Sequence, residues 1–309
     1  MKFINGIHNI KYKNKKKSII TIGNFDGIHI GHQNLLNKAC YIKKIDKYEL
    51  ILIIFEPQPM EFFLYDKSPL RLTNLRTKIE ILARWHIDKI ICIKFNNYFS
   101  KIHAEHFIKK ILINKLSMKK LIIGDDAHLG YKKQGNFSFI KKLSNKYNFS
   151  LIKIEKICKN KNRVSSSLIR KYILKNNFFL ANKLLGYSFY IKGKVFYRNK
   201  NNKKLGFTTV NIILKKNMLS LKGSYIVLVY FCGKKYFGLA NIKNEFIFSN
   251  KKLILEAHLI NFKKKIYGCL LKVIFKKKII NKKKINSIKE QKKQIILNLN
   301  KTKQYFNIK

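Results

Sequence analysis

The chain has 309 residues, of which 46% are hydrophobic, so it is long and apolar enough for two ordinary domains with sizeable cores. No stretch approaches the roughly 18 consecutive apolar residues of a membrane-spanning helix, and the first residues lack the apolar core of a signal peptide. The five cysteines lie far apart without a Cys-x-x-Cys pair, which argues against a disulfide framework or a zinc site, so we expect a cytoplasmic protein without a membrane partner.

The charge is extreme, because 67 Lys and Arg residues stand against 15 Asp and Glu residues and give a formal net charge of +52. Such a balance is typical of proteins that bind nucleic acid or anionic surfaces. The lysines, however, are spread along the whole chain and accompany heavy use of Ile and Asn, as an AT-rich genome would produce. We therefore expect no specific nucleic-acid partner, and only the salt-sensitive binding that charge alone causes.

The first strong pattern in the chain is a strand, a tight turn and a helix within Ser18–Leu36. An apolar run indicates a buried strand that stops at Gly23, and apolar residues recur at helical spacing after His32. The turn between them carries Asp26 and His29. A glycine-bearing turn before a helix presents N–H groups and a positive helix end to an anion, which suits attack on a nucleotide phosphate. The alternative is a pair of surface histidines before a helix.

Strands and helices alternate through the first half of the chain. Further apolar runs predict buried strands at Glu49–Phe55, Lys89–Phe95, Lys120–Gly124 and Leu151–Ile157. Helices are predicted at Ala104–Leu116 and at Arg71–Trp85, the second capped by Thr73 and with an apolar stripe of Leu75, Ile79 and Leu82. The alternation favours a parallel, Rossmann-like α/β sheet. The prolines of Glu56–Pro59 either end a strand or shape a substrate-facing loop.

A second candidate anion site lies at Arg163–Arg170, which reads Arg-Val-Ser-Ser-Ser-Leu-Ile-Arg. The serines could be no more than a helix N-cap. Alternatively, the two guanidiniums beside the free N–H groups of a helix start would suit a triphosphate.

The pattern changes after Gly186, where we place the boundary between a first domain, 1–185, and a second domain, 186–309. Short β-rich runs separated by turns follow, at Tyr190–Phe196, Thr209–Leu214, Ser224–Phe231, Tyr236–Asn241, Leu253–Ile260 and Cys269–Phe275. These runs predict an antiparallel barrel or sandwich. A capping box from Ser287 to Glu290 predicts a final helix. In the fifth run, Glu256 and His258 share one face, either as a surface pair or as a base aimed at a hydroxyl.

These motifs, in this order, resemble a known family along nearly the whole chain. Thr21–His32 is similar to the signature of the HxGH nucleotidylyltransferases, and its flank resembles the bacterial bifunctional riboflavin kinase/FMN adenylyltransferases. The resemblance implies an α/β Rossmann-like nucleotidylyltransferase domain, then an antiparallel β-barrel riboflavin kinase-like domain with a C-terminal helix. It implies phosphorylation of riboflavin to FMN by ATP with Mg²⁺, and adenylylation of FMN to FAD with release of pyrophosphate.

In the first domain the resemblance assigns catalysis to His29 and His32. It assigns nucleotide binding to Gly23, Asn24, Asp26, Gly31, Asp126, Arg163, Ser166, Ser167 and Arg170. The segment Ala127–Gly130 departs from the family's Phe-Arg-Phe-Gly, which affects part of the implied flavin pocket.

In the second domain, Leu255–Phe262 resembles the riboflavin kinase motif whose glutamate is the catalytic base, and Glu256 takes that place. Gly206–Asn211 resembles the family's Gly-Phe-Pro-Thr-Ala-Asn, so Thr209 and Asn211 are the implied ligands of Mg²⁺ and phosphate.

The departures from the family are concentrated in this second domain. Tyr197–Lys203 lacks the glycines of the family's phosphate flap, and Lys243–Ile247 replaces Gly-Thr-Arg-Pro-Thr. A kinase with a rebuilt flap, a slow kinase and a barrel kept as scaffold are all consistent with this. We expect a weakened but functional kinase, and the alternative is an FMN adenylyltransferase with an eroded kinase domain.

Three other classes fit less well. Gly130 and Gly135 have P-loop spacing, but Asn136 stands where a P-loop requires Lys. A class I aminoacyl-tRNA synthetase fragment would need a Lys-Met-Ser-Lys-Ser motif, which is absent, and the β-rich second half does not suit it. A basic nucleic-acid-binding protein would need exposed aromatics among the lysines of one face.

Overall fold

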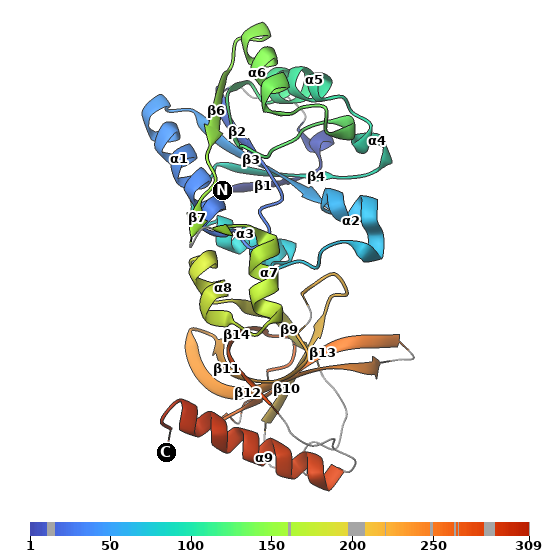
Figure 1. The fold of residues 1–309 in the computed structure, drawn as a ribbon, viewed down its shortest axis with the longest axis vertical. Helices are drawn as coiled ribbons and strands as arrows, with labels where there is room; N and C mark the ends of the chain where they lie inside the picture. The colour runs from blue at the N-terminus through green and yellow to red at the C-terminus, as the bar shows by residue number, and fades with distance from the viewer. Residues whose placement is uncertain are drawn as a thin grey trace. The chain divides into compact units, whose positions relative to one another are not determined.

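The computed structural model describes residues 1–10, 16–159, 162–196, 208–219, 221–247, 250–262, 264, 266–280 and 288–308. The chain divides into two compact units (Figure 1). The first unit comprises Met1–Pro69 and Asn74–Leu168, and the second comprises Leu70–Thr73 and Ile169–Lys309. The predicted segment 197–203, residues 206–207 of the Gly206–Asn211 motif, and Ser287 of the predicted capping box lie outside the described residues.

The first unit is built on a six-stranded parallel sheet in the order β1-β4-β3-β2-β5-β6. Its strands are β1 (Lys2–Asn5), β2 (Ser18–Ile22), β3 (Glu49–Glu56), β4 (Lys89–Lys94), β5 (Met118–Gly124) and β6 (Ser150–Ile154). Every residue of β2 is buried, as in strands covered on both faces. The predicted parallel α/β sheet is confirmed, and β1 is a sixth strand that the sequence analysis missed.

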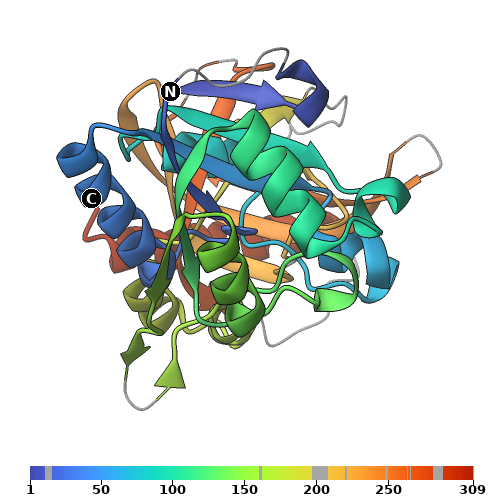
Figure 2. The same ribbon diagram turned by 90° about the horizontal axis from the view of Figure 1, so that it is seen from above.

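Helices connect these strands and lie beside the sheet (Figure 2). They are α1 (Ile30–Asp46), α2 (Pro59–Leu64), α3 (Leu75–Leu82), α4 (Asn97–Ser100), α5 (Ala104–His106) and α6 (Phe137–Lys146), with a two-stranded hairpin of β7 (Cys158–Lys159) and β8 (Asn162–Arg163) after β6. A helix is present where one was predicted at Ala104–Leu116, but only its first three residues, α5, are α-helical. The rest, Phe107–Lys115, is a π-helix.

The predicted helix at Arg71–Trp85 is shorter in the structure, and its cap and buried face also differ from the prediction. Asn74, not Thr73, is the N-cap, because the Asn74 side chain accepts a hydrogen bond from the Thr77 N–H at 2.8 Å. The buried face consists of Thr77, Lys78, Ile81 and Leu82. Of the predicted stripe of Leu75, Ile79 and Leu82, only Leu82 belongs to it, and the buried Lys78 was not predicted.

The strand order places a switch point between β2 and β5. The chain passes from β2 to β3 and β4 on one side, and β5 then returns to the other side of β2. In open α/β sheets, ligands bind beyond the carboxyl ends of the strands at such a point. The residues after β2, β5 and β6 are therefore placed to form a site.

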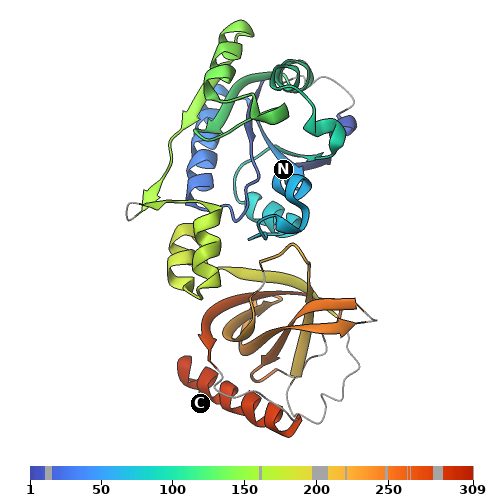
Figure 3. The ribbon, with the colours of Figure 1, turned by 45° about the vertical axis from the view of Figure 1, so that its right-hand side comes forward.

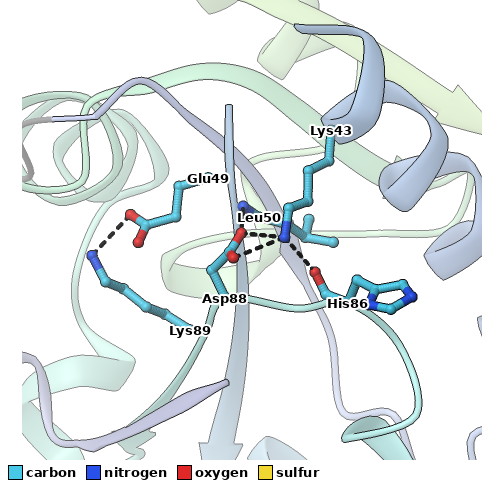
Figure 4. Close-up of polar contacts among 6 residues, drawn as sticks. All are labelled: Lys43, Glu49, Leu50, His86, Asp88 and Lys89. Carbon is cyan, nitrogen blue, oxygen red and sulfur yellow. Dashed lines mark hydrogen bonds and ion pairs between the residues drawn. The ribbon is translucent and has the colours of Figure 1, made fainter. Parts of the chain in front are cut away.

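A polar cluster at the opposite, amino ends of the strands ties α1 to the sheet (Figure 4). The Asp88 carboxylate accepts hydrogen bonds from the Leu50 N–H of β3 and from Lys43 Nζ of α1, both at 2.8 Å. Lys43 Nζ also donates to the His86 carbonyl, and Lys89 pairs with Glu49 at 2.8 Å. Asp88 thus links β3 and α1 through hydrogen bonds from a residue of each.

The second unit contains α8 (Phe178–Leu185), most of α7 (Ser166–Leu174), and a closed antiparallel barrel with the order β10-β13-β12-β11-β14-β9. Its strands are β9 (Tyr190–Phe196), β10 (Thr208–Leu214), β11 (Gly223–Phe231), β12 (Lys234–Ile247), β13 (Asn250–Leu259) and β14 (Leu270–Ile279). The predicted antiparallel β domain is confirmed as a barrel. α8 is followed by Gly186, which adopts φ 75°, the left-handed conformation that favours glycine at a helix C-terminus.

The C-terminal helix α9 (Ile288–Tyr305) packs against the outside of the barrel (Figure 3). Leu299 of α9 joins Ile226, Leu239 and Ile279 in a buried apolar cluster, and Phe306 contacts Phe237 with ring centroids 4.5 Å apart. Leu239 and Phe237 alternate with residues that point into the barrel, so the face that α9 covers is the outer face of β12. None of the described helices is both long and apolar enough to cross a bilayer.

We expect Asp88→Ala to lower the free energy of unfolding of the first unit by about 1–3 kcal/mol. The substitution leaves the Leu50 N–H without its acceptor and removes the carboxylate that pairs with Lys43. The chain has a single tryptophan, Trp85 in the first unit, so its fluorescence during urea denaturation reports on this unit. Glu105→Gln, which breaks an exposed pair with Lys146, is the control and should change the midpoint less. Equal shifts for both variants would contradict the structural role of Asp88.

Candidate active sites

A cavity of about 400 Å³ opens at the switch point of the first unit. It is lined by the residues that follow β2, β5 and β6 and by the start of α7. Among the residues that line it are Gly23, Asn24, Asp26, His29, Gly31, His32, Asp126, Arg163, Ser166 and Ser167. The structure therefore brings the two predicted nucleotide signatures, separated by more than a hundred residues in the sequence, to one cavity.

The signature turn, Gly23–His29, has a strained backbone. Phe25, Gly27 and Ile28 have φ values of 45°, 75° and 38°. Positive φ is costly for residues with a side chain, and such conformations persist only where the surroundings impose them. Phe25 and Ile28 are both fully buried, so packing holds their side chains in place.

Three side chains hold the carbonyls of this turn. Lys78 Nζ donates to the Asn24 carbonyl. Ser166 Oγ donates to the Asp26 carbonyl and Gln33 Nε2 to the Ile28 carbonyl, each at 2.9 Å. The donors come from α3, α7 and α1, so three separate helices fix the turn.

The two signature histidines stack on each other, with ring centroids 3.8 Å apart and an angle of 22° between the rings. His29 is the N-cap residue of α1 and is buried. A Cβ at Gly31 would lie 3.1 Å from His29 Nδ1, so glycine leaves room for this arrangement. The predicted alternative of two surface histidines is wrong.

His32 is held in its neutral form. Burial lowers the pKa of His32 well below the usual value, and the neighbouring His29 and Lys78 lower it further. His32 Nδ1 is buried and has no hydrogen-bond partner within the described part of the chain. A buried ring nitrogen of this kind is suited to a ligand that enters the cavity.

Asp126 and Arg163 form an ion pair at the edge of the same cavity. Burial raises the pKa of Asp126, but the hydrogen bond and the positive charge of Arg163 outweigh burial and hold the pKa below the usual value. The N-cap reading of the serine cluster is confirmed for Ser165, whose Oγ accepts a hydrogen bond from the Leu168 N–H at 3.2 Å. Ser166 Oγ instead donates to the Asp26 carbonyl, and the role of the segment toward a triphosphate stays a prediction.

Arg170 is placed differently from the other predicted residues. It belongs to the second unit, where its Nε donates to the Leu70 carbonyl. The structure gives this guanidinium a backbone partner, and its predicted role toward a nucleotide stays a prediction.

An aromatic cluster in the first unit was missed by the sequence analysis. Phe55, at the end of β3, contacts Phe95 and Phe99, and Phe62 of α2 contacts Phe95, with ring centroids 5.5 to 5.8 Å apart. Phe63 beside them is 58% exposed. The phenylalanines lie in three separate stretches of sequence, so only the fold shows that they meet.

The second unit has its own polar cluster on adjacent strands of the barrel. Glu256 of β13 lies directly opposite Asn211 of β10 and Asn241 of β12. His258 lies opposite Thr209, and His258 Nδ1 is 3.0 Å from the Thr209 hydroxyl oxygen. Because residues directly opposite one another share a face, the predicted ligands and the predicted base are neighbours.

This cluster is largely buried, so the alternative of a surface pair is wrong. Glu256 and His258 are 8% and 1% exposed. Burial lowers the pKa of His258, Glu256 acts in the opposite direction and Lys243 lowers it again. Asn211 Oδ1 is buried without a hydrogen-bond partner among the described residues.

Lys243 is a member of this cluster that the sequence analysis did not assign. Its Nζ lies 3.1 Å from Glu256 Oε2 and 2.9 Å from Glu245 Oε1. Both Lys243 and Glu245 fall in the segment that replaces the family's Gly-Thr-Arg-Pro-Thr, and here β12 continues through that segment paired with β13. A buried carboxylate is costly unless it is paired, and Lys243 supplies the partner of Glu256.

Two different protein families match the two halves of the chain. The FAD synthetase family matches residues 11–168, and the riboflavin kinase family matches residues 185–306. The chain is 45% identical to the bifunctional riboflavin kinase/FMN adenylyltransferase of Buchnera aphidicola subsp. Schizaphis graminum over 312 residues, covering 100% of both chains. It is 34% identical to the protein of that name in Escherichia coli strain K12, covering 100% of this chain and 99% of the relative.

A solved structure shares the fold. The crystal structure titled macrolide-efflux protein from Streptococcus pneumoniae matches with a TM-score of 0.82, covering 98% of this chain and 99% of the other, at 23% identity. The matches to both families and to full-length relatives establish both activities, with riboflavin, FMN, FAD and ATP as the family's substrates and products. The chain belongs to the family of bifunctional riboflavin kinase/FMN adenylyltransferases, which make FMN and FAD.

Proposed function

We propose that the cavity of the first unit performs adenylyl transfer and that the polar cluster of the barrel performs the kinase reaction, with the boundary at Gly186 where α8 ends. The observation that carries the first assignment is the meeting of both nucleotide signatures at one switch-point cavity. The matches of residues 11–168 and 185–306 to the two families support the division.

In the adenylyl transfer, an oxygen of the FMN phosphate attacks the α-phosphorus of ATP. The bond from that phosphorus to the β-phosphate bridging oxygen breaks, and pyrophosphate leaves. His29, His32 and the signature turn donate hydrogen bonds to the charge that develops on the phosphate oxygens. The residues that position the nucleotide are Gly23, Asn24, Asp26, Gly31, Asp126, Arg163, Ser166 and Ser167. Arg170 is proposed as a further contact to the triphosphate. No covalent intermediate with the protein is required.

In the kinase reaction, Glu256 accepts the proton of the riboflavin hydroxyl as its oxygen attacks the γ-phosphorus of ATP, and ADP leaves. Lys243 holds Glu256 Oε2, which leaves Oε1 as the oxygen that meets the hydroxyl. The geometry of one buried, oriented carboxylate favours a working kinase over a barrel kept only as scaffold.

The residues of the barrel cluster fit Mg²⁺, which prefers oxygen ligands and keeps much of its shell for water and phosphate. We propose that Asn211 Oδ1 and the Thr209 hydroxyl hold it, because the first is a buried acceptor and the second lies on the same face. When bound, Mg²⁺ neutralises charge on the phosphates of ATP.

The aromatic cluster of Phe55, Phe62, Phe95 and Phe99, with the exposed Phe63 beside it, offers a planar flavin ring an apolar wall. We propose that the loop before α2 therefore faces the flavin substrate. All five cysteines are free thiols, which fits a reducing compartment, and we propose a cytoplasmic location.

We expect His29→Ala and His32→Ala each to lower the rate of FAD formation from FMN by on the order of 10²-fold or more, because each removes a donor to the transition state. The measurement is FAD produced from FMN and ATP with Mg²⁺, separated by chromatography. FMN production from riboflavin by the same variants is the internal control and should not change. A wild-type rate of FAD formation in a folded double variant would refute the assignment.

We expect Glu256→Gln to lower FMN formation from riboflavin by on the order of 10²–10⁴-fold, because glutamine keeps the shape but cannot take the proton. Glu290→Gln, an exposed carboxylate on α9, is the matched control and should retain the wild-type rate. FAD formation from added FMN should stay normal in both. If wild type and Glu256→Gln gave the same FMN rate, Glu256 would not be the base.

A further inference from the structure

Lys78 of α3 is completely buried, with 0% of its surface exposed. Lysine is almost never fully buried unless its ammonium is compensated, because the charge loses its hydration. Ile81 and Leu82 lie one turn further along the same buried face, so the position looks apolar in its helical spacing. A charged residue retained there calls for a specific partner.

One hydrogen-bond partner of Lys78 lies in the signature turn. Lys78 Nζ donates to the carbonyl of Asn24, the residue that follows Gly23. The bonds from Ser166 and Gln33 hold two further carbonyls of the turn, but those donors are neutral. Lys78 is thus the charged member of a set of three that imposes the positive φ values of Phe25 and Ile28.

The same ammonium also acts on His32 through its charge. His32 is surrounded by the stacked ring of His29, by the ring of Phe25 with its centroid 5.1 Å away, and by the charge of Lys78. Asp126, paired with Arg163, lines the same cavity, and Asp26, Asp125, Glu155 and Lys156 line it as well. Lys78 lowers the pKa of His32, in the same direction as burial does.

We propose that Lys78 is a positioning residue for adenylyl transfer, whose buried ammonium fixes the signature turn from behind and sets a positive charge beside the two histidines. The inference rests on the proposed assignment of adenylyl transfer to this cavity. Lys78 acts through Asn24 and His32 rather than on the substrate itself.

The test compares Lys78→Met, which keeps the length but removes charge and donor, with Lys78→Arg, which keeps both. We expect Lys78→Met to lower kcat for FAD formation by roughly 10–100-fold with little change in KM, because the donors of the turn lose their alignment. Burial favours the neutral imidazole of His32, and the Lys78 charge lowers its pKa further, so loss of that charge raises the pKa of His32. The acid limb of the pH–rate profile should therefore move to higher pH in Lys78→Met and stay near wild type in Lys78→Arg.

Three controls accompany these variants. Lys142→Met removes an exposed lysine from α6 and should change nothing. FMN formation from riboflavin, measured on each variant, should stay at the wild-type rate. Trp85 lies just after α3, so its fluorescence reports whether that helix remains in place.

A folded Lys78→Met with wild-type kcat and acid limb would overturn the proposal. Equal losses in Lys78→Met and Lys78→Arg, with an unshifted acid limb, would also overturn it, because space filling alone would then explain the residue. If Lys78→Met does not fold, Lys78→Arg decides, since a loss beyond about 100-fold in that folded variant contradicts a role of charge and donor. His32→Ala is measured in parallel, and a wild-type rate there would refute the adenylyl-transfer assignment itself rather than the role of Lys78.

Discussion

The signature turn is the constraint on which the first unit depends. Phe25 and Ile28 hold conformations that L-residues avoid, and the turn keeps them because side chains from α1, α3 and α7 bind its carbonyls. The turn follows a completely buried strand, so its starting point is fixed by the sheet. Rigid placement of this kind is what a phosphoryl-type reaction requires, because catalysis there is mostly alignment and charge.

The barrel solves a different electrostatic problem. It buries Glu256 beside Asn211 and Thr209, and a buried carboxylate would be unstable alone. Lys243 provides the counter-charge from a segment in which this chain departs from its family's usual motif. The segment that differs from the family motif is part of β12, which is paired with β13, and it contributes the ion pair to Glu256.

The sequence predicted most of the features that depend on neighbouring residues, such as strands, turns and helices. The strand, turn and helix around His29 and His32, the α/β and β divisions, and the pairing of Glu256 with His258 on one face all follow from short-range periodicity. Contacts formed by distant segments were not predictable, because no local pattern signals them. The burial of Lys78 within the apolar face of α3 depends on its hydrogen bond to the distant Asn24 carbonyl, which no local pattern signals. Asn74 rather than Thr73 caps the helix, and because both residue types can form such a cap, the sequence alone did not distinguish them.

We propose that the two reactions use separate sites, so that FMN made in the barrel of one chain can serve the first unit of another chain. The most direct measurement supplies riboflavin, ATP and Mg²⁺ to full-length His32→Ala, to full-length Glu256→Gln, and to an equal mixture of the two. We predict that His32→Ala accumulates FMN, that Glu256→Gln forms FMN and FAD from riboflavin on the order of 10²-fold more slowly than wild type or worse, and that the mixture makes FAD. A mixture that fails to make FAD, or either variant making FAD alone at the wild-type rate, would contradict it.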